Sequence, residues 1–337
     1  MRAVDLPVGL ATSVGPLPHA DPAEACAYVL DAQPGLPALP SVPNRSLLDR
    51  RIAQAAWGIP GVHVMPDGSV EVDHDVLEPE TPFTDREFAG AAYETLHRFL
   101  DAVADRQGPA KFQLTGPVSL GIALHAVGVD RPRAFAAART VVRTRAAALL
   151  DLVERRAPGV TPVVFVDEPG MRSCLDPEFP VGPNDALDLV STVLAVLERR
   201  AITALRCGPG GPADWQLLLQ AGPQILCVPL DGGIEHGSGS LTQFVENGGW
   251  IAWAAIPTSG PIGSSGDRPW RQLADVWCEL VTGGCDPVPL RTQAIVMPTT
   301  GLGTHTIAQA TEILDLTAEI AGRVQDQATG IRLTVGA

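Results

Sequence analysis

Lysine is nearly absent from this chain. Lys111 is its only lysine, so almost all of the 24 basic residues are arginines, and they stand against 38 acidic residues, a formal charge of -14. A protein that binds nucleic acid shows the opposite, a basic footprint toward the phosphate backbone. The composition therefore excludes nucleic acid as the expected partner.

Long hydrophobic runs are missing as well. The longest apolar stretches, such as Trp250 to Pro257, fall far short of the roughly 18 residues that a membrane-spanning helix needs. The residues near the start, with Arg2, Asp5 and Pro7, lack the apolar core of a signal peptide. We therefore expect a cytoplasmic protein with no membrane partner.

Paired cysteines and nucleotide-binding glycine motifs are also lacking. The six cysteines are scattered with no C-x-x-C spacing, which argues against a disulfide framework and against a local zinc knuckle. No G-x-G-x-x-G or Walker sequence follows an apolar run, so nucleotide cofactors lose their usual sequence support. Any metal site would have to gather its ligands from distant strands.

Short apolar runs that alternate with longer helical patterns dominate what is present. This alternation is typical of βαβ units, and it repeats eight times over about 300 residues, counting an irregular, proline-broken run from Gly35 to Pro43. It predicts a single (β/α)8 TIM barrel in one domain, residues 1–337, with a core of about 8–325. A small hairpin insertion is predicted near residues 62–72, turned by Pro66-Asp67-Gly68.

The carboxyl ends of the strands are where a barrel of this kind places its active site. Asp167 and Glu168 stand in tandem at one such end, so one carboxylate can point into the site and the other into the wall. Such a pair suits acid or base catalysis or the anchoring of an amine, and the alternative is a carboxylate that caps a helix or braces a loop.

Cys207 follows Arg206 at another strand end. A neighbouring cation lowers the pKa of a thiol, which would favour a thiolate nucleophile or metal ligand, whereas a buried cysteine is commonly a small hydrophobic residue. His19 stands without a neighbouring ligand-type side chain, as do the other candidate proton carriers, His125, His236 and His305. Asp231 opens a glycine-rich stretch that fits either a site lid or a plain loop.

Five strand-end motifs succeed one another along the chain: Val14-Gly15-Pro16-Leu17-Pro18-His19, Gln113-Leu114-Thr115-Gly116-Pro117, Val166-Asp167-Glu168-Pro169, Leu205-Arg206-Cys207 and Pro298-Thr299-Thr300-Gly301-Leu302. Their order resembles the catalytic barrel of cobalamin-independent methionine synthase, within the superfamily that it shares with uroporphyrinogen decarboxylase. The resemblance runs from near residue 8 to near residue 325. It is specific for the fold and much less so for the activity.

In that family a zinc ion activates homocysteine to take a methyl group from a methylfolate. The family holds this zinc with a His-x-Cys segment, a glutamate and a second cysteine. The resemblance places the His-x-Cys segment at Leu205-Arg206-Cys207 and the second cysteine at Thr300, so Cys207 is the only one of these ligands that is retained. Asp231 would have to reach back to take the place of the glutamate. One certain ligand does not hold zinc, which ordinarily needs three or four. We expect no metal and no other cofactor.

The resemblance carries Asp167 over as the carboxylate that holds an amino-acid substrate. The predicted catalytic residues are Asp167, Glu168 and Cys207. The residues predicted to bind substrate lie at the other strand ends, and they are Gly15, His19, Gln113, Thr115, Arg206, Asp231 and Thr300.

Three functions remain open. The first is a methyl- or alkyl-transferase-like enzyme without an intact zinc site, acting on a small thiol or amino acid, with Asp167 holding the amine and Cys207 as acceptor thiolate. The second is a metal-free, decarboxylase-like lyase, which needs several inward arginines, of which only Arg206 is placed. The third is a catalytically inactive barrel that binds a small molecule. A second copy of the chain and a methyl-donor protein are further partners to consider.

Overall fold

Seven parallel strands form the main sheet of the computed structural model, which describes residues 4–84, 86–209 and 213–335, without the side chains of 331–335. Their order in the sheet is β1-β9-β8-β7-β6-β5-β4. The strands are β1 (Leu10–Ala11), β4 (Gly108–Thr115), β5 (Val160–Asp167), β6 (Ile202–Arg206), β7 (Ile225–Pro229), β8 (Trp250–Ile256) and β9 (Ala294–Pro298). The fold is TIM-barrel-like, with a curled sheet whose edge strands, β1 and β4, do not pair directly.

The predicted eighth strand, residues 35–43, lies in the gap between these two edges. Leu39 donates its amide to the carbonyl of Lys111 in β4 at 2.8 Å, and Ser41 donates to the carbonyl of Gly15 at 2.9 Å. Only isolated bridges join this segment to its neighbours. Prolines at 37, 40 and 43 remove the amide donors that a continuous ladder requires, so the expected closed eight-stranded barrel is corrected to seven strands and this proline-rich seam.

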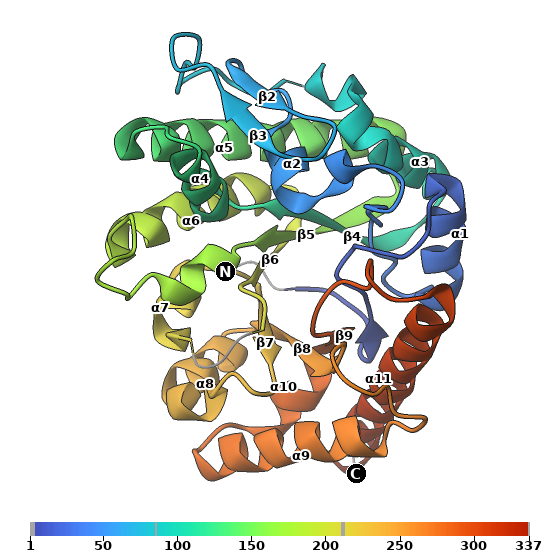
Figure 1. The fold of residues 1–337 in the computed structure, drawn as a ribbon. Coiled ribbons are helices and arrows are strands. Elements are labelled where there is room, and N and C mark those ends of the chain that lie inside the picture. The colour runs from blue at the N-terminus through green and yellow to red at the C-terminus, as the bar shows by residue number, and fades with distance from the viewer. Residues whose placement is uncertain (1–3, 85, 210–212, 336–337) are drawn as a thin grey trace.

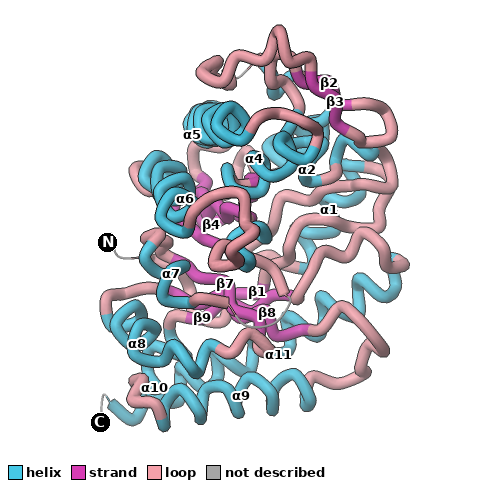
Figure 2. Tube along the Cα trace, turned by 60° about the vertical axis from the view of Figure 1, so that its left-hand side comes forward, coloured by secondary structure: helices cyan, strands magenta, loops and turns pink. Residues whose placement is uncertain are grey.

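Helices form an outer layer around the curled sheet (Figures 1 and 2). The α-helices are α1 (Pro22–Ala32), α2 (Arg51–Ala56), α3 (Glu94–Ala102), α4 (Pro117–Ala126), α5 (Arg131–Arg156), α6 (Pro183–Leu197), α7 (Trp215–Gln220), α8 (Ser238–Glu246), α9 (Asp267–Thr282), α10 (Pro287–Thr292) and α11 (Ile307–Val335). Short 3-10 helices span Leu47–Asp49, Glu87–Ala89, Ala91–Tyr93, Pro169–Ser173 and Ile234–Gly237. No helix in the described part of the chain is both long and apolar enough to cross a membrane.

Two stretches of helical turns are interrupted in the structure. The first, from 47 to 56, divides at Arg50, and the second, from 87 to 102, divides at Gly90, because both residues have extended backbones. A Cβ atom at Gly90 would lie 2.2 Å from the indole nitrogen of Trp57, so the chain passes too close to this ring for any side chain. Asp21 caps α1, since its carboxylate accepts from the amides of Ala23 and Glu24.

Side chains of the parallel strands are buried on both faces, as the βα alternation leads one to expect. Along β5, Val164 and Val166 pack outward against the helices, whereas Val163 and Phe165 fill the inside of the curl. The same interior holds Lys111, which is 1% exposed and places its ammonium group 4.6 Å from the centre of the Phe165 ring. A charged group therefore lies within a largely apolar interior.

The predicted hairpin insertion is confirmed. Strands β2 (Val62–Val64) and β3 (Val70–Val72) pair antiparallel, with Val62 opposite Val72. Gly68 closes the turn at a φ of +78°, a left-handed conformation that favours glycine. The turn reaches the cavity described next, and Gly68 is one of the residues that line it.

Candidate functional site

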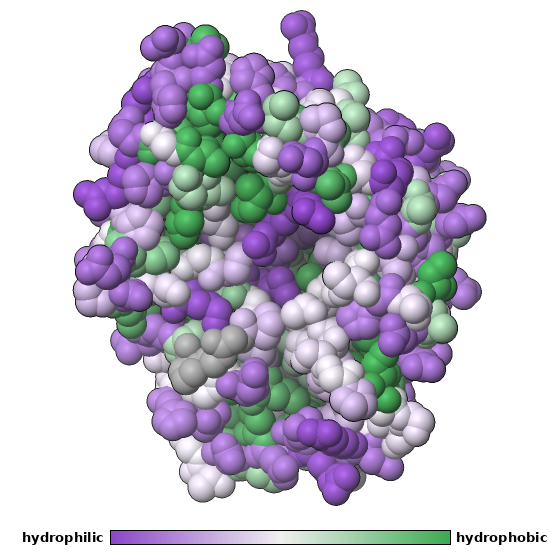
Figure 3. Space-filling model, viewed as in Figure 1, coloured by the Kyte–Doolittle hydropathy of each residue, from purple (hydrophilic) through white to green (hydrophobic). Residues whose placement is uncertain are grey.

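A cavity of about 620 Å³ lies at the carboxyl ends of β4, β5 and β6, and we call it the first cavity. The loop after β1, the seam, α2 and the turn of the hairpin complete its wall. Figure 3 shows a hollow with hydrophilic residues near the middle of the face seen in Figure 1. This is the end of the sheet where enzymes with TIM-barrel folds carry their active sites.

Asp167 and Arg206 form a buried ion pair in the floor of the first cavity. They are directly opposite each other in the ladder of β5 and β6, and their side chains are only 10% and 7% exposed. Arg206 Nη1 lies 3.6 Å from Asp167 Oδ1, and Nη2 donates to the carbonyl of Thr299 at 3.0 Å. Among the described residues, Asp167 Oδ1 and Arg206 Nε have no hydrogen-bond partner. Both atoms are buried, so the floor of the first cavity contains polar groups whose hydrogen-bonding capacity is unmet.

Three more arginines line the first cavity, and the sequence analysis missed all of them. Arg50 and Arg51 come from the start of α2, and Arg172 comes from the 3-10 helix after β5. Arg172 Nη1 donates to the carbonyl of Gly208 at 2.6 Å, while its buried Nε and Nη2 have no hydrogen-bond partner among the described residues. Arg172 could have been predicted, because it follows the strand that carries Asp167. Arg50 and Arg51 could not, because α2 does not follow directly from a strand end.

Glu168 points away from the first cavity and into the wall. Its two oxygens accept from the amides of Val118 at 2.7 Å and Ser119 at 2.8 Å, in the first turn of α4. Burial raises the pKa of Glu168 to about 7, although these hydrogen bonds oppose the shift. The tandem carboxylates therefore separate as the sequence suggests, Asp167 to the cavity and Glu168 to a helix N-terminus, where it braces α4.

Cys207 lines the first cavity but is only 3% exposed. Burial raises the pKa of its thiol well above the ordinary value, and the nearby Glu168 and Cys227 act in the same direction. Arg172 and Arg206 lower that pKa by less. The net shift is opposite to the one that would make Cys207 a thiolate, because desolvation outweighs the neighbouring cations.

The residues present do not fit a zinc site. In the part of the chain that the structure describes, no three side chains of His, Cys, Asp or Glu come together as metal ligands. Cys207 and Thr300 both line the first cavity, but Leu205 is a fully buried hydrophobic residue and Asp231 lies elsewhere.

Gln113 and Thr115 line the first cavity as neighbours along β4. Gln113 Nε2 donates to the carbonyl of Leu39 in the seam at 2.7 Å, and Thr115 Oγ1 donates to the carbonyl of Arg51 at 3.2 Å. Gly15 lies against the Gln113 side chain with a φ of +131°, and a Cβ atom there would be 2.6 Å from Nε2. Gly15 thus permits the close approach of Gln113.

His19 and Asp231 lie apart from this group. The His19 ring packs against Tyr28 of α1, with the ring centroids 4.8 Å apart, and burial lowers its pKa. Asp231 is exposed and lines a second cavity, of about 590 Å³, at the ends of β7, β8 and β9. The structure therefore places Asp167, Cys207, Gln113, Thr115, Arg206 and Thr300 together on the first cavity, and Gly15 beside it.

The second cavity shares Pro209 and Thr300 with the first but has a different chemical character. The described residues that line it include no arginine or lysine. Its polar groups are mainly hydroxyls, and Thr258 Oγ1 hydrogen-bonds both Thr299 Oγ1 and Thr300 Oγ1. His305 Nε2 lies 2.9 Å from the Thr258 carbonyl oxygen.

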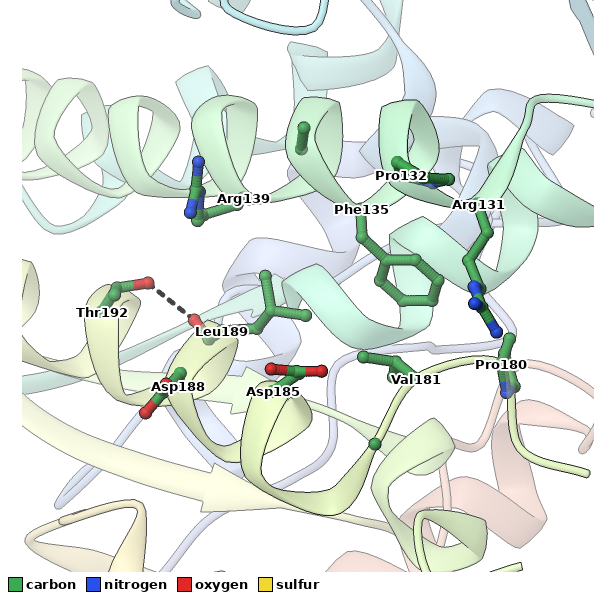
Figure 4. Close-up of a pocket in the computed structure, with 12 residues that line it drawn as sticks. Arg131, Pro132, Phe135, Arg139, Pro180, Val181, Asp185, Asp188, Leu189 and Thr192 are labelled. Atoms are coloured by element: carbon green, nitrogen blue, oxygen red, sulfur yellow. Dashed lines mark hydrogen bonds between the residues drawn. The ribbon is translucent and has the colours of Figure 1, made fainter. Parts of the chain in front are cut away.

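A third cavity, of about 440 Å³, lies in the outer layer between α5 and α6 (Figure 4). Arg131, Phe135 and Arg139 of α5 face Asp185 and other residues of α6 across it. It is formed by side chains on the outer helices and contains none of the strand-end residues. The first cavity is therefore the better candidate for a site.

No family model matches the sequence, and no curated protein matches it either. Among solved structures, a B12-independent methionine synthase from Shewanella sp. W3-18-1, in complex with selenomethionine, is similar to 96% of this chain and 99% of its own, with a TM-score of 0.59 and 11% identity. This likeness supports the fold expected from the sequence over essentially the whole chain. At this identity it says nothing about methyl transfer or substrate.

Two further structures are more distant. An endo-fucoidan hydrolase of glycoside hydrolase family 107 has a TM-score of 0.40 at 10% identity, over 94% of this chain and 92% of its own. D-psicose 3-epimerase from Clostridium cellulolyticum H10, with D-tagatose, has a TM-score of 0.34 at 9% identity, over 73% and 84%.

Proposed function

We propose that this protein is a methyl- or alkyl-transferase-like enzyme that acts, without zinc, on a small amino acid or thiol carrying a carboxylate. The observation that carries the proposal is the buried Asp167–Arg206 pair, in which Oδ1 and Nε have no hydrogen-bond partner among the described residues. A substrate ammonium group would pair with the Asp167 carboxylate, and a substrate carboxylate would pair with the arginines that line the same cavity. The structural likeness to a methionine synthase supports an enzyme-like barrel.

The arginines of the first cavity give the substrate thiol its reactivity in this proposal. A thiol attacks an alkyl group as its thiolate, after its proton has passed to water, and the sulfur then takes the alkyl group as the donor's leaving group departs. Positive charge from Arg51, Arg172 and Arg206 would lower the pKa of a bound thiol and so do part of what a metal does elsewhere. The substrate supplies the thiolate, because burial keeps Cys207 protonated.

A thermal-shift and calorimetric screen tests the proposal with L-homocysteine, L-methionine and L-homoserine. A ligand present at about 100 times its dissociation constant adds roughly 2.7 kcal/mol of stability. We expect homocysteine to bind, and Asp167→Asn or Arg206→Met to weaken its binding at least about tenfold through the loss of a charge-assisted hydrogen bond. Asp231→Asn, in the second cavity, is the matched control and should bind as wild type does.

Turnover is assayed by mass spectrometry with a methylfolate and with a sulfonium as methyl donors. Appearance of methylated thiol supports the transferase. Binding of homocysteine without any turnover would instead favour a barrel that binds a small molecule and has lost catalysis. Absence of homocysteine binding would overturn the proposal.

A metal-free lyase is the second candidate, and one observation favours it. Such an enzyme needs several arginines for the carboxylates of its substrate, and the structure brings Arg50, Arg51 and Arg172 to the cavity that already holds Arg206. A tricarboxylate that binds at least about a hundredfold more tightly than acetate, and loses carbon dioxide in the presence of the protein, would support it. Equal affinity for acetate and the tricarboxylate would remove its basis.

A further inference from the structure

Lys111, the only lysine of the chain, has few partners for a buried ammonium group. Its Nζ lies 3.2 Å from Gln113 Oε1 and 3.4 Å from the Val14 carbonyl oxygen, with the Phe165 ring beneath it. In the described part of the chain this ammonium group forms no hydrogen bond or ion pair with a carboxylate. Burial lowers the pKa of Lys111 to about 8, so desolvation outweighs the attraction of the nearby Asp167.

The charges around Lys111 do not balance. The titratable and charged groups that face it are Asp167 from β5, Arg206 from β6 and Cys227 from β7. Ala252 and Ala254 of β8 and Ile295 and Met297 of β9 belong to the apolar cluster that also contains Phe165, the ring beneath Lys111. Two cations therefore share a single carboxylate, and the neutral thiol of Cys227 adds no negative charge.

A buried cation that lacks a full partner costs stability. Arg145 is a second buried cation, whose guanidinium group donates to the carbonyls of Ala55 at 2.8 Å and Trp57 at 3.1 Å and lies over the Phe83 ring, while its Nε has no hydrogen-bond partner among the described residues. Lys111 has a comparable set of contacts. It differs from Arg145 in that both of its hydrogen-bond partners, Gln113 and Val14, line the first cavity.

We propose that Lys111 is a specificity-determining residue for anions, whose buried ammonium group finds its missing counter-charge in the carboxylate or other anion that enters the first cavity. The proposal rests on the proposed function only in taking the first cavity as the binding site. Lys111 is not itself one of the residues that line this cavity. Its ammonium group lies behind the wall, in contact with the Gln113 side chain and the Val14 carbonyl, and acts on the anion through its charge. An anion bound there favours the protonated lysine, so the pKa of Lys111 rises on binding.

The sign of the pH dependence follows from linkage. Because the bound anion raises the pKa of Lys111 above its value of about 8 in the free protein, anion affinity is greatest below pH 8 and falls as the pH rises through the pKa of the complex. Reciprocally, the anion shifts the titration of Lys111 upward by the same coupling. A single lysine makes this shift directly observable.

The experiment uses the full chain with 13C-labelled lysine, because one side-chain Cε resonance then reports Lys111 alone. Sulfate serves as the generic anion and L-homocysteine as the proposed substrate. We expect the Lys111 titration to move upward by at least about one pH unit with saturating sulfate, which corresponds to about tenfold in affinity. An unchanged titration, or no sulfate binding at all, would overturn the proposal, and this holds even if no lysine variant folds.

Two variants separate a role in anion binding from a structural one. Lys111→Met should weaken sulfate binding at pH 7 about tenfold and abolish its pH dependence between pH 7 and 10, with the midpoint of urea unfolding unchanged or raised. Lys111→Arg should restore the affinity. Arg145→Met, the control, should lower the unfolding midpoint. A Lys111→Met protein that is as destabilised as Arg145→Met and binds sulfate as wild type does would contradict the assignment.

Failure of this inference is distinguishable from failure of the proposed function. Lysine-dependent sulfate binding without homocysteine binding leaves Lys111 as an anion-specific residue and removes the proposed substrate. Homocysteine turnover with the same affinity and pH profile in Lys111→Met keeps the enzyme and overturns the role of Lys111.

Discussion

The two halves of the sheet's carboxyl edge differ in the number of charged side chains that they bury. The β4–β6 half buries an ion pair, a lone ammonium group and a carboxylate, and four arginines line its cavity. The β7–β9 half has an apolar interior and a rim of hydroxyls that satisfy one another. Buried charge is costly unless it is paired, so the first half carries a cost that the second avoids. This asymmetry points to the first half as the place where a charged ligand binds.

Removal of Arg206 should have the largest effect on stability. Arg206→Met leaves the buried Asp167 carboxylate without its partner, so we expect a loss of about 3 kcal/mol in the free energy of unfolding, measured with urea. Arg323→Met removes an exposed cation that bridges Asp267 and Glu319 and should cost less than about 1 kcal/mol. Equal losses in the two variants would contradict the expectation that a buried charge contributes more to the free energy of unfolding than a surface charge does.

Glu168 should give the β4–β6 half a pH-dependent stability. Its pKa of about 7 in the folded protein lies above the ordinary value of 4.5, so the folded state holds an extra proton between these pH values. Stability due to this residue is therefore present below pH 4.5 and lost as the pH rises to 7, on the order of 3 kcal/mol in all.

The comparison with Glu168→Gln isolates this contribution. The free energy of unfolding of wild type, measured with urea from pH 4.5 to 8, should fall relative to that of Glu168→Gln across the window and then run parallel to it. Parallel curves throughout the window would mean that Glu168 titrates normally in the folded protein.

A hydroxyl in the other half should matter less than these charges. Thr258→Val removes the hydroxyl that joins Thr299 and Thr300, and we expect a loss of about 1 kcal/mol, without a change in pH dependence between 4.5 and 8. Urea unfolding at three pH values measures both quantities. A pH-dependent loss would show that the change at Thr258 also alters the surroundings of His305, whose ring lies 2.9 Å from the Thr258 carbonyl oxygen.

We expect the thiols of Cys278 and Cys207 to differ in reactivity, in an experiment that leaves the stability of the protein unchanged. Cys278 in α9 is exposed, whereas Cys207 is buried and its pKa is raised. In native protein at pH 8, Ellman's reagent should modify Cys278 first, and Cys278→Ser should remove the fast phase. Rapid modification of Cys207 in that variant would restore the thiolate interpretation.

Sequence alone went far toward the fold because apolar runs and helical patterns alternate so regularly. It also placed Asp167, Cys207, Gln113, Thr115 and Thr300 near one another, since parallel strands bring their carboxyl ends to one edge. The direction in which the pKa of Cys207 shifts could not be predicted from the sequence, because it depends on whether desolvation of the thiol outweighs the effect of the nearby cations.

Other parts of the site could not be predicted from the sequence for related reasons. Arg50 and Arg51 approach the cavity from α2, which comes after the seam and whose position depends on tertiary packing. His19 belongs to the first strand-end motif, but its ring packs against Tyr28. A loop residue after a strand end can turn either toward the cavity or toward a helix. Strand-end rules locate a site and leave its loops undetermined.

The proline-rich seam has a mechanical consequence for the first cavity. Four backbone hydrogen bonds hold residues 37–41 to the two sheet edges, made by Leu17, Leu39, Ser41 and Lys111 as donors. The neighbouring strands β4 and β5, by contrast, pair over eight successive residues. The wall that carries Ser41 is therefore joined to the sheet by fewer backbone hydrogen bonds than the wall formed by β4 and β5.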